Sequence, residues 1–305
     1  MPRTPSAGTR VVRRSAWGRF ASPPFAVLAV LAATVSGSLV VAVSSAPASP
    51  AARSRATRAT GVTPPAGLPG RWNLVFDDEF NGPSLDRSIW RTCYDWGCTI
   101  STNNEEESYV SSGVSLGGGR LVLTATQRST RGLPFSSGMV QSNGRFDFEY
   151  GYMEIRAKVP TSPGVWPAFW AVPENGSWPP EIDAMEFYAN QPNAVQETVH
   201  FPPGDTQLNH IVYGPDFGNG YHIYGADWEP GSVSFYVDGV LRFRVAQSPA
   251  LPMYLIANLA VSSPPSAATA HSYPASYEID WIRVYQHPGI GSSSCPRRNC
   301  VPVPS

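Results

Sequence analysis

The chain has 305 residues, 42% of them apolar, with 27 glycines and 31 prolines. This is enough for one large domain or two small ones, and an all-β sandwich of this size commonly stays a single domain. Residues 1–70 contain eight arginines and no acid, so residues 71–305 carry 14 basic and 23 acidic residues, a net charge of −9. Unless its basic residues gather at one site, such a body repels nucleic acids and sulfated or uronate-rich polymers, which favours a neutral ligand.

The first 48 residues have the pattern of a secretory signal peptide. Arginines are frequent in residues 1–19, an apolar run covers residues 25–43, and Ala46-Pro47-Ala48 is a small-residue cleavage signal. The alternative is an uncleaved membrane anchor, because the apolar run is nearly long enough to span a bilayer. Polar residues within the run favour the signal peptide. We therefore expect a secreted protein without stable membrane association after cleavage.

Residues 49–70 are rich in Ala, Pro, Ser, Thr and Arg without periodicity, which predicts a disordered linker. The four cysteines form two pairs with the same spacing, Cys93/Cys98 and Cys295/Cys300. Outside the cell such pairs predict disulfides, and two local bridges are favoured among the three connectivities. The spacing and the lack of a nearby histidine argue against zinc. We expect one folded domain over 71–287 and a C-terminal tail over 288–305.

From Trp72 onward the chain alternates short β-branched and aromatic segments with turns. Asp238-Gly239 between two alternating runs is a strong hairpin signal. No stretch keeps helical periodicity for three turns. The pattern therefore predicts an all-β domain, a double-sheet sandwich or jelly roll. The clearest predicted strands are residues 120–126, 152–159, 232–237, 240–245, 252–259 and 277–285.

Three acids lie close together in the segment from Glu181 to Glu186. In a strand, Glu181 and Asp183 project to the same side, and Ile182 points into the core. Strict alternation would turn Glu186 inward, but a β-bulge at Ala184-Met185 returns it to the acidic face. A row of three carboxylates is unfavourable for stability, so it points to chemistry or metal binding.

Glycoside hydrolysis requires two nearby carboxylates with different pKa values, one to attack the anomeric carbon and one to protonate the leaving oxygen. The spacing alone also allows a solvated acidic edge strand or a calcium site. Sugar rings have apolar faces that stack on aromatic side chains, and three tryptophans near the row could bind them. These are Trp166, Trp170 and Trp178.

The segment Glu-Ile-Asp-Ala-Met-Glu resembles the E-x-D-x-x-E signature of family 16 of the glycoside hydrolases, in its laminarinase-like branch. Further similar segments follow in the same order between residues 74 and 286. They are Leu74–Asn81, Asn103-Asn104-Glu105, Tyr150–Lys158, Val165–Trp170, His222–Gly225, Phe235–Gly239 and Glu278–Tyr285.

The resemblance implies a β-jelly roll of the concanavalin A-like kind, with a concave cleft for a polysaccharide. It implies a retaining mechanism in which Glu181 is the nucleophile, Glu186 is the general acid/base, and Asp183 assists between them. Glu186 should then have the raised pKa and Glu181 the low one. Asn104, His200 and Asn258 match substrate-facing positions. No cofactor is required for catalysis, but a structural calcium ion on the convex side would use Glu79 and Asp280.

Two departures concern the edge of the cleft. Pro180 stands where laminarinases commonly have Gly, and Ser262-Ser263-Pro264-Pro265 replaces a Gly-Gly with a nearby Trp. These departures bear on the preference for β-1,3-glucan more than on hydrolase activity. The resemblance implies a monomeric endo-β-glucanase for β-1,3- or β-1,3/1,4-glucan. Hydrolysis of an agar- or carrageenan-type polysaccharide, transglycosylation and non-catalytic glucan binding remain as alternatives.

Overall fold

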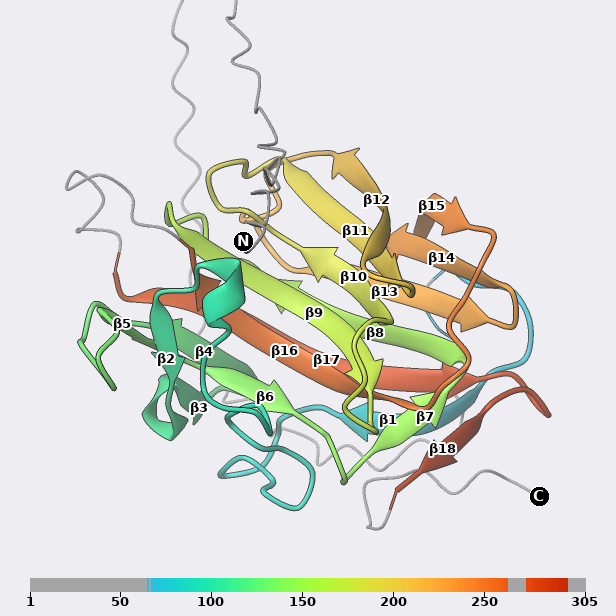
Figure 1. The fold of residues 1–305 in the computed structure, drawn as a ribbon, viewed down its shortest axis with the longest axis horizontal. Helices are drawn as coiled ribbons and strands as arrows, with labels where there is room; N and C mark the ends of the chain where they lie inside the picture. The colour runs from blue at the N-terminus through green and yellow to red at the C-terminus, as the bar shows by residue number, and fades with distance from the viewer. Residues whose placement is uncertain (1–64, 66, 263–272, 296–305) are drawn as a thin grey trace, which may run out of the picture. The chain divides into compact units, whose positions relative to one another are not determined.

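Alternating segments form the strands of two packed sheets. A computed structural model describes residues 65, 67–262 and 273–295 (Figure 1). The chain divides into two units, residues 1–55 and 56–305, and the described residues all belong to the second. The predicted signal peptide, most of the predicted linker and Cys300 lie outside them. No helix within the described residues is long and apolar enough to cross a membrane.

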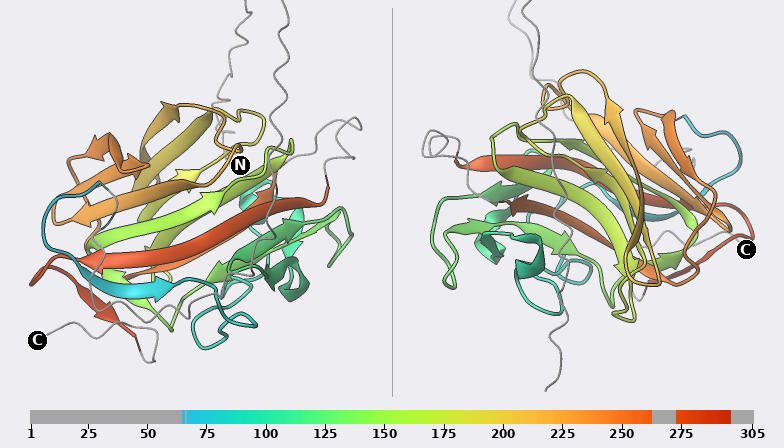
Figure 2. Two further views of the ribbon diagram at one scale, coloured as in Figure 1. Left: turned by 180° about the vertical axis from the view of Figure 1, so that it is seen from behind. Right: turned by 45° about the horizontal axis from the view of Figure 1, so that its top comes forward.

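The first sheet is antiparallel, with the order β15-β14-β13-β8-β17-β4-β3 and with β1 paired to β17. Its long central strands β8 and β17 lie side by side (Figure 2). Its members are β1 (Asn73–Asp78), β3 (Val114–Leu116), β4 (Leu121–Ala125), β8 (Gly151–Lys158), β13 (His222–Glu229), β14 (Ser232–Val237), β15 (Val240–Val245) and β17 (Ala275–Gln286).

The second sheet is also antiparallel, with the order β12-β11-β10-β9-β16-β7-β18 and with β6 paired to β16. The acidic segment forms β10, which lies between β9 and β11 (Figure 1). The members are β6 (Met139–Gln141), β7 (Asp147–Glu149), β9 (Val165–Pro173), β10 (Glu181–Glu186), β11 (Ala194–Phe201), β12 (Thr206–Tyr213), β16 (Met253–Val261) and β18 (Ser292–Ser294).

Two 3-10 helices and one small sheet lie outside the two main sheets. The strands β2 (Glu107–Tyr109) and β5 (Phe135–Ser137) pair in parallel, and the only 3-10 helices of the described residues are η1 (Ser101–Asn103) and η2 (Ser111–Gly113). A disulfide joins Cys93 to Cys98, as the spacing predicted. The second predicted pair includes Cys300 and so lies outside the described residues.

The main core fills the space between the two sheets. Phe169, Ile182 and Met185 contribute to it from the second sheet, and Ile155 and Phe235 from the first. Burying each such side chain stabilises the fold by about 1.5–3 kcal/mol, which is why one face of every central strand is apolar. The predicted sandwich and all six predicted strands are therefore confirmed. The turn at Asp238-Gly239 is confirmed as well, with both residues at positive φ.

Candidate active site

A bulge in β10 brings the three acids onto one face of the second sheet. Asp183 pairs with Trp170 of β9 and Glu186 pairs with Ala168, so Ala184 and Met185 together stand opposite the single residue Phe169. Both bulge side chains are fully buried in the core between the sheets. The predicted bulge at this position is confirmed, and it gives Glu186 the same facing as Asp183.

The three carboxylates line a cleft of about 570 Å³ on the outer face of the second sheet. The cleft reaches from the segment Tyr94–Glu105 across β16, β9, β10 and β11 to Gln207 on β12. Its floor is a second apolar cluster that includes Ala168, Trp170 and Tyr254. Among the described residues that line the cleft there are five acids and no lysine or arginine. An open groove with an aromatic floor and convergent carboxylates suits an extended, uncharged ligand.

Glu181 and Glu186 have different hydrogen-bond partners. The indole N–H of Trp178 donates to Glu181, and Glu181 also shares a hydrogen bond with Asp183. Glu186 is largely buried and receives bonds from three donors on neighbouring elements. These donors are Thr198 Oγ1 at 3.1 Å, Gln196 Nε2 at 3.2 Å and the Tyr188 hydroxyl at 3.3 Å.

Burial raises the pKa of all three acids. For Glu181 the loss of hydration is the largest cause, the charge of Asp183 adds to it, and the pKa lies well above its usual range. Burial and the charge of Glu186 act in the same direction on the pKa of Asp183. Burial also raises the pKa of Glu186, but the bond from Thr198 and the nearby His200 oppose this rise. The expectation of a low pKa for Glu181 is therefore wrong, because burial and the neighbouring charge of Asp183 both favour its protonated form.

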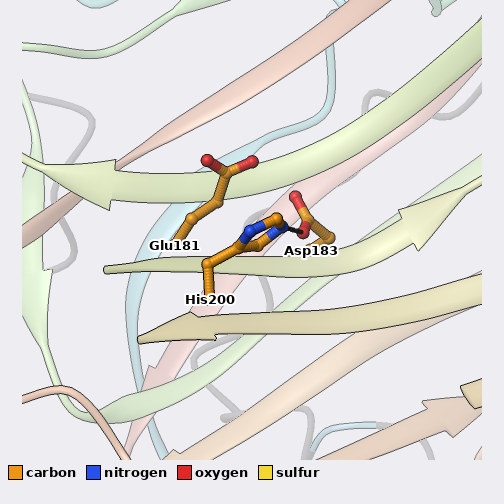
Figure 3. Close-up of side chains that lie close together, drawn as sticks. All are labelled: Glu181, Asp183 and His200. Atoms are coloured by element: carbon orange, nitrogen blue, oxygen red, sulfur yellow. Dashed lines mark hydrogen bonds and ion pairs between the residues drawn. The ribbon is translucent and has the colours of Figure 1, made fainter. Parts of the chain in front are cut away.

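His200 links the row of acids to the turn between β11 and β12. It lies opposite Glu181 in the β10–β11 ladder. Its Nε2 is 3.1 Å from Asp183 Oδ2, and its Nδ1 is 2.7 Å from Asp205 Oδ1. Figure 3 shows Glu181, Asp183 and His200 close together on the two strands, with the bond between His200 and Asp183 as a dashed line.

All three predicted tryptophans line the cleft, but in different ways. Trp178 is 55% exposed and so offers a ring to a ligand. Trp166 is half-buried and stacks on Tyr188 with ring centroids 5.1 Å apart. Trp170 is buried and forms part of the floor. Only Trp178 therefore has the free surface that a stacking platform needs.

The predicted polar residues separate into three groups. His200 lines the cleft beside the acids. Asn258 lines it too, but its amide is engaged internally, accepting from Trp170 Nε1 at 2.8 Å and donating to the Tyr109 hydroxyl at 2.9 Å. Asn104 is exposed and does not line the cleft, whereas its neighbour Asn103 does.

Several cleft residues were not predicted from the sequence. Trp96, 55% exposed, stacks on Tyr94 inside the loop closed by Cys93 and Cys98, with ring centroids 4.7 Å apart. An aromatic residue between two cysteines just before the Asn-Asn-Glu segment was the signal for it. Asp205 lies five residues after His200 and directly follows the turn signal Pro202-Pro203-Gly204. Tyr188 and Gln196 carry no signal of this kind, because their roles depend on strand pairing.

The proposed calcium ligands do not form a cation site. Glu79 is paired with Arg283, and Asp280 with Arg156, so each carboxylate is already neutralised by a guanidinium. Calcium needs six or more oxygen ligands, and an arginine beside each carboxylate repels a second cation. Within the described residues, one group of three acids or histidines has potential ligand atoms that all lie within 4.8 Å of one another. This group is Glu181, Asp183 and His200. Asp183 already forms hydrogen bonds with Glu181 and His200, and Glu181 accepts one from Trp178.

Comparison with known proteins identifies the family. The model of glycosyl hydrolases family 16 matches residues 99–283, which contain the whole acidic row. The chain belongs to glycosyl hydrolases family 16. The family 16 domain thus holds every cleft residue from Ile100 to Asn258 described above, and the resemblance read from the acidic signature is confirmed.

Relatives within family 16 include enzymes that act on β-glucans. The chain is 33% identical over 260 residues to "Glucan endo-1,3-beta-glucosidase A1" of Niallia circulans; the match covers 70% of this chain but only 38% of that relative. It resembles the laminarinase catalytic domain of Thermotoga maritima with 29% identity and a TM-score of 0.66, covering 72% of this chain and all of that one. It also resembles a variant of SCLam, a non-specific endo-β-1,3(4)-glucanase crystallised with a glucan oligosaccharide, with 30% identity and a TM-score of 0.66, covering 72% and 96%.

Proposed function

We propose that the protein is a retaining endo-β-glucanase that hydrolyses β-1,3- or mixed β-1,3/1,4-glucan. The observation that carries this proposal is the bulge at Ala184-Met185, which puts Glu181, Asp183 and Glu186 on one wall of an aromatic cleft. The β-glucanases among its relatives support the choice of substrate. The lack of lysine and arginine among the described lining residues favours a neutral polymer over a sulfated one.

In the proposed first step, a carboxylate oxygen of Glu181 attacks the anomeric carbon and the glycosidic C–O bond breaks. The proton of Glu186 passes to the leaving oxygen, so that a glycosyl ester on Glu181 and an ionised Glu186 result. In the second step Glu186 takes a proton from water, the water oxygen attacks the anomeric carbon, and Glu181 leaves as a carboxylate. Two inversions give net retention. The donors around Glu186 hold its charge in the intermediate.

The extent of the cleft supports endo action. Its lining spans the second sheet from Trp96 to Gln207, and the acids lie between these ends. A polymer can therefore extend past the acids in both directions. Trp178 and Trp96 offer exposed rings on which the apolar faces of sugar units can stack.

The proposal includes export from the cell and action as a monomer. The predicted signal peptide of residues 1–48 supports export, and the Cys93–Cys98 disulfide is of a kind that persists outside the cytosol. Detection of a mature chain that begins after Ala48 in the culture medium tests export. Size-exclusion chromatography with light scattering tests the monomeric state.

The deciding experiment is product analysis on laminarin, lichenan, agarose, κ-carrageenan and xyloglucan. We expect laminarin, lichenan or both to give oligosaccharides whose anomeric protons, followed by NMR, show retention at first. Glu181→Ala should be inactive, and added azide should restore turnover with an α-glycosyl azide as the product. Glu186→Ala with azide should give the β-glycosyl azide instead. Cleavage of agarose or carrageenan alone would move the substrate class, and transfer to sugar acceptors in place of water would indicate a transglycosylase. Binding without any cleavage, equal in wild type and Glu181→Ala, would show a glucan-binding protein.

A further inference from the structure

The turn between β11 and β12 places an acid that the proposed mechanism does not use against the catalytic row. Asp205 Oδ1 lies 2.7 Å from His200 Nδ1, and its Oδ2 accepts a hydrogen bond of 2.7 Å from Gln207 Nε2. Both of its oxygens are therefore engaged by side chains of the two strands that the turn joins. The position of Asp205 is fixed relative to His200.

The two bonds to His200 determine where its hydrogens lie. Partial burial acts to raise the pKa of Asp205, but the bonds from Gln207 and His200 outweigh it and lower that pKa below its ordinary value. Asp205 is therefore an ionised acceptor, and Nδ1 must carry a hydrogen to donate to it. The ring then faces Asp183 with Nε2.

The contact between Nε2 and Asp183 needs a proton of its own. A neutral ring nitrogen and a carboxylate oxygen are both acceptors, and they do not approach to 3.1 Å unless a proton lies between them. The side chains of His200 and Asp183 are only 13% and 4% exposed, so bulk water does not replace this bond. Whichever atom formally holds the proton, the pair carries one negative charge fewer than an ionised Asp183 beside a neutral ring.

We propose that Asp205 is a positioning residue that acts through His200 to hold one proton on the Asp183–His200 pair, which leaves Glu181 as the carboxylate that ionises. This deepens the proposed function and rests on it. The charged groups that face His200 are Glu181, Asp183 and Glu186 from β10 and Asp205 from the turn. Without the proton, Asp183 would present a full charge to Glu181 and delay its ionisation.

The test is the sign of a shift in the pH profile of kcat/KM. Removing the negative charge of Asp205 would, through reduced Coulomb repulsion alone, ease the ionisation of Glu181 and move the acidic limb to lower pH. Loss of the proton on the Asp183–His200 pair has the opposite effect. We expect Asp205→Asn to move the acidic limb up by about 0.5–1 pH unit, and to lower kcat more than it raises KM.

Matched variants separate this role from a purely structural one. Asp238 forms the same kind of bond, 2.7 Å from His222 Nδ1, at an exposed turn outside the cleft lining. Asp238→Asn should therefore leave the profile unchanged. Asp205→Glu keeps the charge and should restore most of the wild-type limb. In a His200→Gln background, Asp205→Asn should have no further effect on the limb.

A second readout does not depend on glucan hydrolysis. Nitrogen-15 NMR of the full chain separates the ring nitrogens of its five histidines, and His200→Gln assigns the relevant signals. We expect a protonated Nδ1 at His200 in wild type at pH 7, and a mixture of tautomers in Asp205→Asn. If no glucan is cleaved but the NMR result holds, the proposed function fails and the proton arrangement stands. A downward or absent shift of the limb, or an unprotonated Nδ1 in wild type, would overturn this inference.

Discussion

The indole Nε1 of Trp170 lies 2.8 Å from Oδ1 of Asn258, a bond between two residues 88 positions apart in the sequence. It joins β9 to β16 under the floor of the cleft, and the amide of Asn258 continues it to the Tyr109 hydroxyl. Asn258 therefore holds the side chains of Trp170 and Tyr109 in place by hydrogen bonds.

Asn258→Leu should destabilise the fold by about 1–3 kcal/mol, because it leaves the buried Trp170 N–H without an acceptor and removes the donor to the buried Tyr109 hydroxyl oxygen. The free energy of unfolding, from urea titration, measures this loss. KM for laminarin should rise as the floor loosens. Replacement of the exposed Asn190 by Leu is the control. An equal loss of stability in both variants would show that the hydrogen bonds of Asn258 do not stabilise the fold.

Deleting Ala184 should abolish activity, because it removes the bulge and turns Glu186 toward the core. A carboxylate forced among apolar side chains also costs several kcal/mol, so the melting temperature should fall. Met185→Leu retains the residue count of the strand and should keep most of the activity. Wild-type rates in the deletion variant would show that the bulge does not set the direction of Glu186.

Glu197 should make stability depend on pH. It is fully buried on the core side of β11, and burial, partly offset by Arg242, raises its pKa from 4.5 to about 8. Between these values the folded state keeps a proton that the unfolded state releases, so stability should fall as pH rises, by up to about 1.4 kcal/mol per pH unit.

Glu197→Gln should remove the part of that slope that Glu197 contributes, and it should be more stable than wild type at pH 8, with little difference at pH 4.5. Chemical unfolding at both pH values measures the effect. The matched control is Glu174→Gln, because Glu174 is an exposed glutamate in a turn. If Glu197→Gln and wild type lose stability in parallel with rising pH, another group is responsible.

Removal of divalent cations should not change stability. Because Arg283 and Arg156 neutralise Glu79 and Asp280, EDTA and millimolar calcium should each leave the melting temperature within about 1 °C of the untreated value. A rise of several degrees with calcium, lost in Glu79→Gln, would show that the arginines give way to the ion.

The disulfide loop should contribute to binding of long chains. Replacing both Cys93 and Cys98 by Ser frees the loop that holds Trp96 on Tyr94. KM should then rise several-fold for laminarin and change less for the shortest cleaved oligosaccharide. Trp96→Ala in the intact loop should reproduce this difference. An unchanged KM in both variants would exclude Trp96 from the substrate path.

Sequence periodicity predicted the sandwich because each strand must bury one face, and the same argument predicted the bulge, since only an extra residue places Glu186 beside Asp183. Contacts between distant strands were beyond its reach. The donors Gln196 and Thr198 reach Glu186 only through the register of β10 and β11. The raised pKa of Glu181 depends on its burial in the cleft. The arginines that pair with Glu79 and Asp280 are Arg283 on β17 and Arg156 on β8, which are brought to these acids only by strand pairing.

The composition of the cleft lining also determines how substrate binding depends on ionic strength. With five carboxylates and no lysine or arginine among the described lining residues, attraction to a neutral chain comes from ring stacking and hydrogen bonds. Such contacts do not weaken when salt screens charges. In a mixture of polysaccharides, the carboxylates of the cleft would repel anionic chains. Neutral chains would bind equally well at low and at high ionic strength.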